Sequence, residues 1–164
     1  MKSESIFTLA LVAFFCLSVV WIPADCTASE SILPISVNSS GIKWYSYEEG
    51  IERGKEEKKN VFLNFYTQWC GYCKKMDKET FANSSIIAYL NENFISIKVN
   101  SDKERQIANY YYVNGLPTSW FLSKEGSKIS SLPGYIPSDM LINILKYIHT
   151  DSYKKMNFRK FMKK

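Results

Sequence analysis

Two cysteines three positions apart, Cys70 and Cys73, are the residues of this 164-residue chain best suited to chemistry. They follow an apolar, β-type run at residues 61–66, so the sequence predicts a strand that leads into a helix with the thiols at the turn. In the first turn of a helix, positions i and i+3 share one face, with Cβ atoms roughly 5–6 Å apart. Because a disulfide needs Cα atoms about 4.4–6.8 Å apart, the pair can close and open with little backbone movement. The pattern therefore indicates reversible dithiol–disulfide exchange.

Other uses of a cysteine pair fit the sequence less well. The loop that Cys70 and Cys73 would close is so short that a disulfide there adds little entropic stabilisation. A zinc site usually has four ligands, and the one histidine of the sequence, His149, lies far along the chain. A c-type haem requires a histidine directly after the second cysteine, where Lys74 stands. The sequence thus predicts neither a metal nor a cofactor.

The N-terminal residues 1–28 have the pattern of a signal peptide for export. An almost unbroken apolar stretch covers residues 6–22, and small residues up to Ala28 offer a cleavage site. We expect cleavage there, which would leave Cys70 and Cys73 as the cysteines of the mature chain. The alternative is an uncleaved membrane anchor, because the stretch is only slightly shorter than the ~20 residues that span a bilayer.

Basic residues are concentrated in a C-terminal tail at residues 151–164. The chain has a net charge of +5, and the surplus lies in this tail, where lysines and Arg159 are interleaved with aromatic residues and methionines. One interpretation is peripheral contact with a membrane surface. The other, which we favour, is a short helix that packs its aromatic side chains on the domain and directs its lysines to solvent. A short terminal patch in an exported chain argues against nucleic-acid binding.

A single domain is expected at residues 42–150, after a linker rich in Ser, Pro and Asn at residues 29–41. Periodicity and capping residues predict the element order α-β-α-β-α-β-β-α, with a further helical piece after the second helix. The expected helices are residues 46–59, 70–81, 84–93, 102–112 and 137–148, and the expected strands are residues 61–66, 94–99, 118–122 and 128–132. A parallel pair of strands followed by a hairpin indicates an α/β fold, a central mixed sheet with helices on both faces.

This order, with the cysteine pair at the second helix, resembles the thioredoxin fold. The segments that carry the resemblance are Trp69-Cys70-Gly71-Tyr72-Cys73-Lys74, Ile97-Lys98-Val99-Asn100, Gly115-Leu116-Pro117-Thr118 and Gly134. Residues 43–94 are most similar to exported members of the family, which include the C-terminal domain of the bacterial transmembrane disulfide-interchange reductase. The resemblance covers residues 42–150 and implies a thiol:disulfide oxidoreductase.

The position of the thiols predicts their roles. Cys70 would lie at the N-terminus of a helix, where unpaired N–H groups and the helix dipole favour an anion, so we expect its thiol pKa to lie below the ~8.5 of free cysteine. Cys70 is therefore the expected nucleophile, and Cys73, one turn inside the helix, resolves the mixed disulfide. We expect Trp69 to cover the pair with apolar surface, Gly71 to permit close approach of a substrate, and Tyr72 to face solvent at the docking rim.

The resemblance also assigns a role to the loop before the third strand. In the family this loop faces the thiols and contains a cis-proline, here Pro117, and Leu116 is apolar as in reducing thioredoxins. The chain departs from the family at Asn64, where a buried aspartate usually accepts the proton of the resolving thiol. An amide cannot accept that proton, so deprotonation of Cys73 must rely on water, Lys98 or another carboxylate. We expect slower release of the mixed disulfide; the alternative is that Asn64 only satisfies buried backbone groups.

The direction of exchange depends on how strongly the Cys70 thiolate is stabilised. Strong oxidants of this fold have a histidine between the cysteines, whereas Tyr72 carries no charge, and Lys74 and Lys75 are expected to point to solvent. This favours the reducing direction. We therefore expect a reductase of oxidised periplasmic proteins that is a monomer and receives electrons from a donor in the inner membrane. The alternatives are an oxidase or isomerase of the same fold, or a non-catalytic binding module. The Gly-Tyr dipeptide also occurs in a periplasmic isomerase, but that isomerase needs a separate dimerisation domain.

Overall fold

The computed structural model describes residues 41–163. The expected signal peptide at residues 1–28 and nearly all of the expected linker lie outside this range. Between residues 41 and 163, no helix is long and apolar enough to cross a lipid bilayer.

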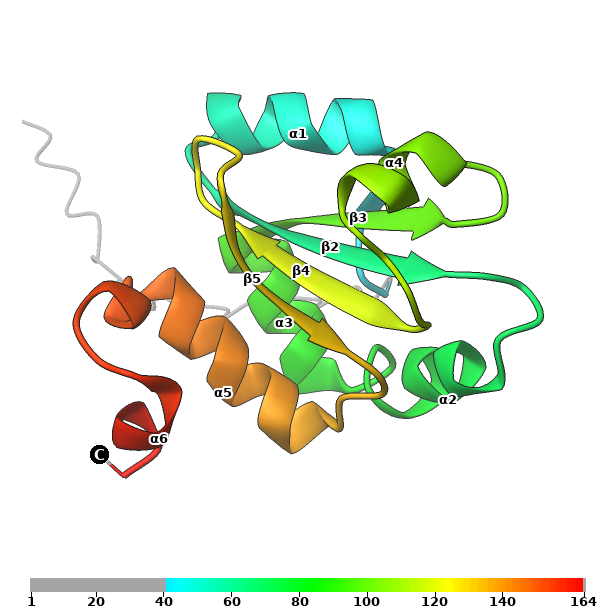
Figure 1. The fold of residues 1–164 in the computed structure, drawn as a ribbon. Helices are drawn as coiled ribbons and strands as arrows, with labels where there is room; N and C mark the ends of the chain where they lie inside the picture. The colour runs from blue at the N-terminus through cyan, green and yellow to red at the C-terminus, as the bar shows by residue number, and fades with distance from the viewer. Residues whose placement is uncertain (1–40, 164) are drawn as a thin grey trace, which may run out of the picture. The chain divides into compact units, whose positions relative to one another are not determined.

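A five-stranded mixed sheet lies at the centre of the fold, in the strand order β1-β3-β2-β4-β5 (Figure 1). The central strand β2 pairs parallel with β3 and antiparallel with β4, while β1 is parallel to β3 and β5 antiparallel to β4. The strands are β1 (Trp44–Tyr45), β2 (Asn60–Tyr66), β3 (Phe94–Asn100), β4 (Thr118–Leu122) and β5 (Lys128–Pro133). The predicted mixed sheet is confirmed, and β1 is an addition too short for sequence periodicity to show.

Helices cover both faces of this sheet, with α1 and α4 on one face and α2, α3 and α5 on the other (Figure 1). Their bounds are α1 (Tyr47–Glu56), α2 (Gly71–Glu79), α3 (Ser84–Asn93), α4 (Arg105–Tyr110), α5 (Ser138–His149) and α6 (Phe158–Phe161), with a 3-10 helix η1 (Ser152–Lys154). Ser46 caps α1 as predicted, since its Oγ accepts a hydrogen bond from the Glu49 amide. The expected helix at residues 102–112 is shorter as α4, because the amides of Lys103 and Glu104 turn back to the carbonyl of Asn100.

Hydrophobic side chains fill the space between the sheet and each helical layer. Phe62 and Phe121 pack toward α5, and Leu63 and Phe65 pack toward α1 and α4, all with no exposed surface. The strand β2 is therefore buried on both faces, as its apolar sequence predicted. Packing on both sides makes β2 a rigid support for the residues that follow it.

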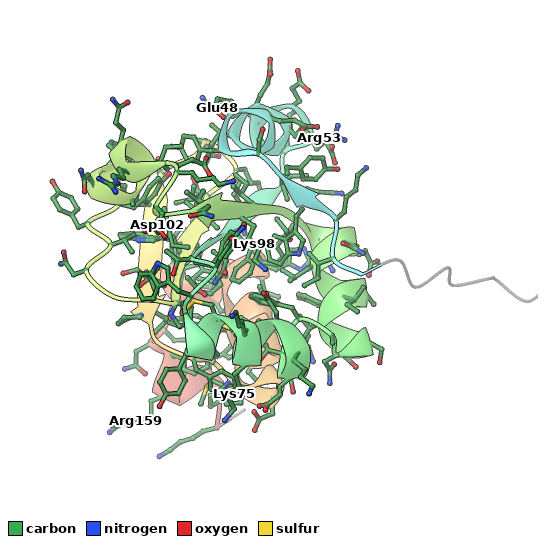
Figure 2. All side chains as sticks on the ribbon, turned by 90° about the vertical axis from the view of Figure 1, so that its right-hand side faces the viewer. Glu48, Arg53, Lys75, Lys98, Asp102 and Arg159 are labelled. Atoms are coloured by element: carbon green, nitrogen blue, oxygen red, sulfur yellow. A yellow bond between two sulfur atoms is a disulfide. The ribbon has the colours of Figure 1, made fainter. Side chains whose placement is uncertain are left out.

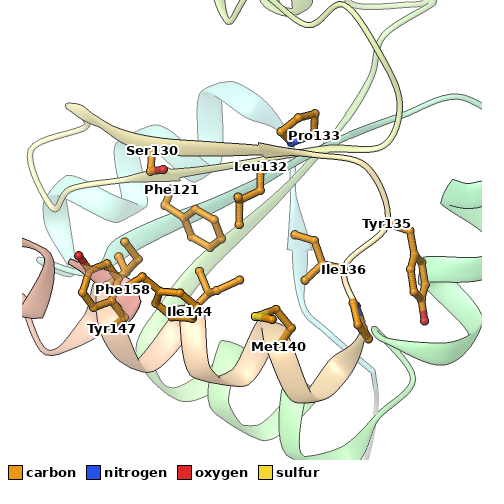
Figure 3. A pocket seen from close by; sticks show the side chains of 12 residues that line it. Phe121, Ser130, Leu132, Pro133, Tyr135, Ile136, Met140, Ile144, Tyr147 and Phe158 are labelled. Carbon is orange, nitrogen blue, oxygen red and sulfur yellow. The ribbon is translucent and has the colours of Figure 1, made fainter. Parts of the chain in front are cut away.

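The C-terminal tail packs against α5. The ring of Tyr147 in α5 lies 5.4 Å from that of Phe158 and 5.3 Å from that of Phe161, measured between centroids. The Tyr147 hydroxyl also donates a hydrogen bond to the carbonyl of Met156, at 2.5 Å. Phe158 borders one end of an apolar cavity of about 540 Å³ between α5 and the last two strands (Figure 3). These contacts place the aromatic side chains of the tail on the domain.

Candidate active site

The strand β2 leads directly to the cysteine pair, as the sequence predicted. β2 ends at Tyr66, and α2 begins at Gly71 with Cys70 as its N-cap. Cys70 and Cys73 form a disulfide, and their Cα atoms lie 5.3 Å apart. This separation is within the range that a disulfide requires, so the backbone already suits the bond. Among the described residues, no three His, Cys, Asp or Glu side chains are grouped to hold a metal ion.

The sulfur of Cys70 lies at the positive end of α2. It accepts a hydrogen bond from the amide of Cys73, at 3.1 Å between the amide nitrogen and the sulfur. In the reduced protein, this amide and the helix dipole would stabilise a thiolate at Cys70. Both cysteines are nearly buried, and Cys70 is the one that borders the adjoining surface groove. The geometry therefore gives a substrate access to Cys70 and keeps Cys73 covered.

We call this hollow of about 400 Å³ the active-site groove. It lies between the turn before α2 and the loop between α4 and β4, and its lining residues are Trp69, Cys70, Gly71, Tyr72, Ser101, Val113, Asn114, Gly115 and Leu116. The peptide bond between Leu116 and Pro117 is cis, as the family resemblance implied. The fold thus brings the cysteine turn and the proline loop together, although they lie far apart in the sequence.

Hydrogen bonds fix the Pro117 end of this loop. The Thr118 hydroxyl donates to the carbonyl of Gly115 at 2.8 Å, and the Gly134 amide donates to the carbonyl of Pro117 at 2.7 Å. Gly134 has a φ of 92°, in the left-handed region that favours glycine. The glycine noted in the sequence ahead of the last helix therefore supports the proline loop.

Trp69 and Tyr72 lie at the rim of the active-site groove and are 70% and 66% exposed. The exposure of Tyr72 matches the prediction, and Trp69, which we expected to cover the cysteine pair, lines the groove together with Cys70. The Trp69 indole N–H donates to the carboxylate of Asp102 at 2.8 Å. Sequence analysis missed Asp102. The parallel register could have placed it, because Tyr66 pairs with Asn100 where both strands end.

Asn64 is buried in β2, beside Lys98 of β3 in the parallel register. Its side-chain amide donates to the hydroxyl of Ser119 at 3.2 Å, so it bonds a side chain rather than backbone groups. The Lys98 ammonium points toward α2, where it lies 2.5 Å from a carboxylate oxygen of Asp77 (Figure 2). Asp77 follows Cys73 by four positions, so the two side chains share one face of α2. Asp77 is thus a carboxylate near Cys73 that sequence analysis did not place.

Comparison with known families decides what kind of domain this is. The profile of the thioredoxin-like domain matches residues 47–149, which is most of the chain. The chain belongs to the thioredoxin-like family. Members of this family are thiol:disulfide oxidoreductases. The disulfide of this chain and the groove beside it are consistent with that activity.

Individual relatives of this thioredoxin-like domain include disulfide-exchange proteins. Protein disulfide isomerase-like 5-2 of rice is 36% identical over 92 residues, which are 56% of this chain and 21% of that protein. The thiol:disulfide interchange protein DsbD of Photorhabdus laumondii is 32% identical over 74 residues, which are 43% of this chain and 13% of that protein. A thioredoxin from Thermus thermophilus shares the fold, with a TM-score of 0.61, 23% identity, and coverage of 66% of this chain and 87% of its own. This chain therefore spans a small part of the two longer relatives.

Proposed function

We propose that this thioredoxin-like protein is an exported reductase of disulfides in periplasmic proteins. The observation that carries the proposal is the active-site groove, in which the sulfur of Cys70 lies at the N-terminus of α2 opposite the loop of the cis-proline Pro117. An extended substrate segment can enter this groove and present a disulfide to Cys70. The burial of Cys73 supports its role as the second, resolving thiol.

The reaction consists of two exchanges of sulfur. The Cys70 thiolate attacks one sulfur of the substrate disulfide, that bond breaks, and the departing substrate sulfur takes up a proton. Cys73 then loses its proton and attacks the sulfur of Cys70, which releases the second substrate thiol and forms the disulfide of the structure. Two electrons pass to the substrate, so a second dithiol must reduce the pair before the next cycle. We assign that role to a donor embedded in the inner membrane.

The proton of Cys73 needs an acceptor, and the buried amide of Asn64 cannot serve. We assign this role to Asp77, one helical turn after Cys73 and paired with Lys98. The Asp77 side chain is 42% exposed and that of Lys98 only 19%, so water has access to the carboxylate while the ammonium beneath it is largely covered. The contact with Lys98 holds the Asp77 carboxylate on the face of α2 that it shares with Cys73.

Charges near Cys70 support the reducing direction. Tyr72 between the cysteines is exposed and neutral, and Lys74 and Lys75 are exposed, where solvent screens their charge. The Lys75 ammonium also lies 4.7 Å from the ring centroid of Tyr135 and 3.9 Å from the carboxylate of Glu79. The charges on this helix are therefore exposed to solvent, and a thiolate without strong extra stabilisation favours a reductant.

The test is the reduction potential of the Cys70–Cys73 pair, measured by equilibration against dithiothreitol and glutathione. We expect a value near the thioredoxin end of the range, about −270 mV. A value near about −120 mV would instead identify a disulfide donor and reverse the proposed direction. Mass analysis after alkylation reports the redox state directly, because each free thiol adds one alkyl group.

The proposal of export is tested separately, because it depends on the sequence of residues 1–28. We expect the chain recovered from the periplasmic fraction to have a mass that begins at Ser29. Recovery of the full-length chain in the membrane fraction would identify an uncleaved anchor, and recovery in the cytoplasm would contradict export.

A further inference from the structure

Exposed aromatic side chains lie in the active-site groove and in the segment that leads into its wall. Of the six large hydrophobic side chains that are exposed within the described residues, four are aromatic. Trp69 and Tyr72 line the groove itself, and Tyr110 and Tyr112, 62% and 80% exposed, lie in the segment that leads into its opposite wall at Val113. Exposed apolar surface that adjoins a groove is typical of a surface that binds protein chains. Aromatic side chains are therefore exposed both in the groove and in the segment that enters its wall at Val113.

Lys128, the first residue of β5, is in contact with this segment. Its ammonium donates to the carbonyl of Tyr110 at 2.7 Å and lies 3.9, 4.5 and 5.5 Å from the ring centroids of Tyr110, Tyr111 and Tyr112. The ring of Trp120 in β4 is also 5.5 Å away. An ammonium is attracted to the faces of aromatic rings and to carbonyls at the C-terminal end of a helix, where Tyr110 lies. A single side chain thus joins β5 to three consecutive tyrosines.

The segment has a defined conformation that depends on its neighbours. Tyr111 is buried, and its hydroxyl lies 3.2 Å from that of Tyr47. Burial raises the pKa of Tyr111 far above its usual value, so this hydroxyl stays neutral. Tyr112 has a φ of 52°, a left-handed conformation that is unusual for a residue of this size. Surrounding contacts must hold such a residue in place, and the contacts of Lys128 are among them.

We propose that Lys128 is a positioning residue for protein substrates, which fixes Tyr110 and Tyr112 as an aromatic extension of the active-site groove. The occupant is an extended segment of an oxidised protein, whose apolar residues beside the cystine pack on these two rings. This inference rests on the proposed reductase function and names its substrate class. The continuity of the segment with the groove wall at Val113 supports it.

Small disulfides should not depend on this surface. Tyr110 and Tyr112 are not among the residues that line the groove at Cys70, so a small disulfide can reach the sulfur without touching them. The other end of the loop, at Pro117, is held by hydrogen bonds that do not involve Lys128. Loss of the Lys128 ammonium should therefore weaken the docking of proteins and leave the chemistry of the cysteines unchanged.

The experiment compares two disulfides on the full chain. Steady-state reduction of insulin gives kcat and KM, and stopped-flow reaction of the reduced chain with 5,5′-dithiobis(2-nitrobenzoate) reports a small disulfide. Lys128→Met, which removes the charge but keeps the length, should raise KM for insulin about five-fold with kcat unchanged. The rate with the small disulfide should match that of the parent chain. Lys128→Arg should restore KM, and Lys124→Met, in the same hairpin, serves as the control.

A second variant, Tyr112→Ser, keeps Lys128 and removes a docking ring, so it should raise KM for insulin in the same way. The proposal is wrong if KM for insulin is unchanged in Lys128→Met, or if both substrates slow equally. A parent chain that reduces neither substrate overturns the reductase function and the docking proposal together. A parent chain that reduces both, with Lys128→Met unaltered, overturns the docking proposal alone.

Discussion

The proposed cycle requires Cys73 to lose a proton, and Asp77, paired with Lys98, is the proposed acceptor. We expect Asp77→Asn to slow release of the mixed disulfide at least about ten-fold, because general-base assistance to Cys73 is lost. Single-turnover stopped-flow with a fluorescent peptide disulfide measures this step. Glu79→Gln, two positions further along the same helix, is the control and should match the parent chain. Equal release rates for the Asp77→Asn variant and the parent would exclude Asp77 as the proton acceptor.

Asn64 permits the reverse test. Asn64→Asp places a carboxylate beside Lys98 in the parallel register, on the buried side of the site. We expect it to release the mixed disulfide faster than the parent chain, since a second acceptor becomes available to Cys73. The same stopped-flow assay measures it, and Asn64→Ala controls for loss of the hydrogen bond to Ser119. Turnover of Asn64→Asp no faster than that of the parent contradicts the expected role of position 64.

At the scale of residues, the sequence predicts what short spacing determines. The place of Cys70 and Cys73 follows from an apolar strand and helical spacing, and Asp77 could have been found from its four-residue distance to Cys73. The hydrogen-bond partner of Asn64 could not have been found from the sequence. Ser119 reaches it through the antiparallel register of β2 and β4, which depends on a turn and a loop far along the chain.

The helix α1 packs closely on the sheet because two of its residues are glycines. A Cβ atom added at Gly50 would lie 2.3 Å from the side chain of Ile97, and one at Gly54 would lie 2.6 Å from that of Val61. Gly50→Ala should therefore lower the free energy of unfolding by about 1 kcal/mol or more, since overpacking outweighs the better helix propensity of alanine. Urea denaturation measures the change. Gly41→Ala, whose Cβ would meet nothing within 4 Å, is the control; unchanged or raised stability of Gly50→Ala would show that α1 can move away from β3.

At the scale of elements, the strong periodic segments were predictable and the short ones were not. The buried strand β2 and the hairpin of β4 and β5 match their expected positions, and the helix after Ser46 begins where expected but ends at Glu56, before the expected Lys59. By contrast, β1 has only two residues, Trp44 and Tyr45, and their pairing with Ser96 and Ile97 is set by β3 rather than by a local pattern. The start of α4 was misplaced because the chain after Asn100 forms a hydrogen-bonded turn, which has the same polar composition as a helix start.

At the scale of the whole molecule, the sequence left two interpretations of the basic tail, contact with a membrane surface or packing on the domain. The side-chain contacts of the tail help to choose between them. A salt bridge of 3.2 Å joins Lys154 to Asp151, and the rings of Tyr153, Phe158 and Phe161 gather around Tyr147. Aromatic side chains that are packed on α5 are not available to insert into a lipid surface. Tyr153 and Phe158 are partly buried against the hydrophobic core, which supports the interpretation that the tail packs on the domain.

Phe158 is the residue that tests this arrangement. It is partly buried and borders the cavity of about 540 Å³ beside α5, so Phe158→Ala should enlarge that cavity (Figure 3). We expect a loss of about 2 kcal/mol in the free energy of unfolding, below the ~3–5 kcal/mol of a fully buried phenylalanine. Urea denaturation of the full chain measures it, with Lys160→Ala on the same helix as the control. If the two variants are equally stable, the tail does not pack on α5 in solution, and contact with a membrane surface becomes the better interpretation of its lysines and aromatic residues.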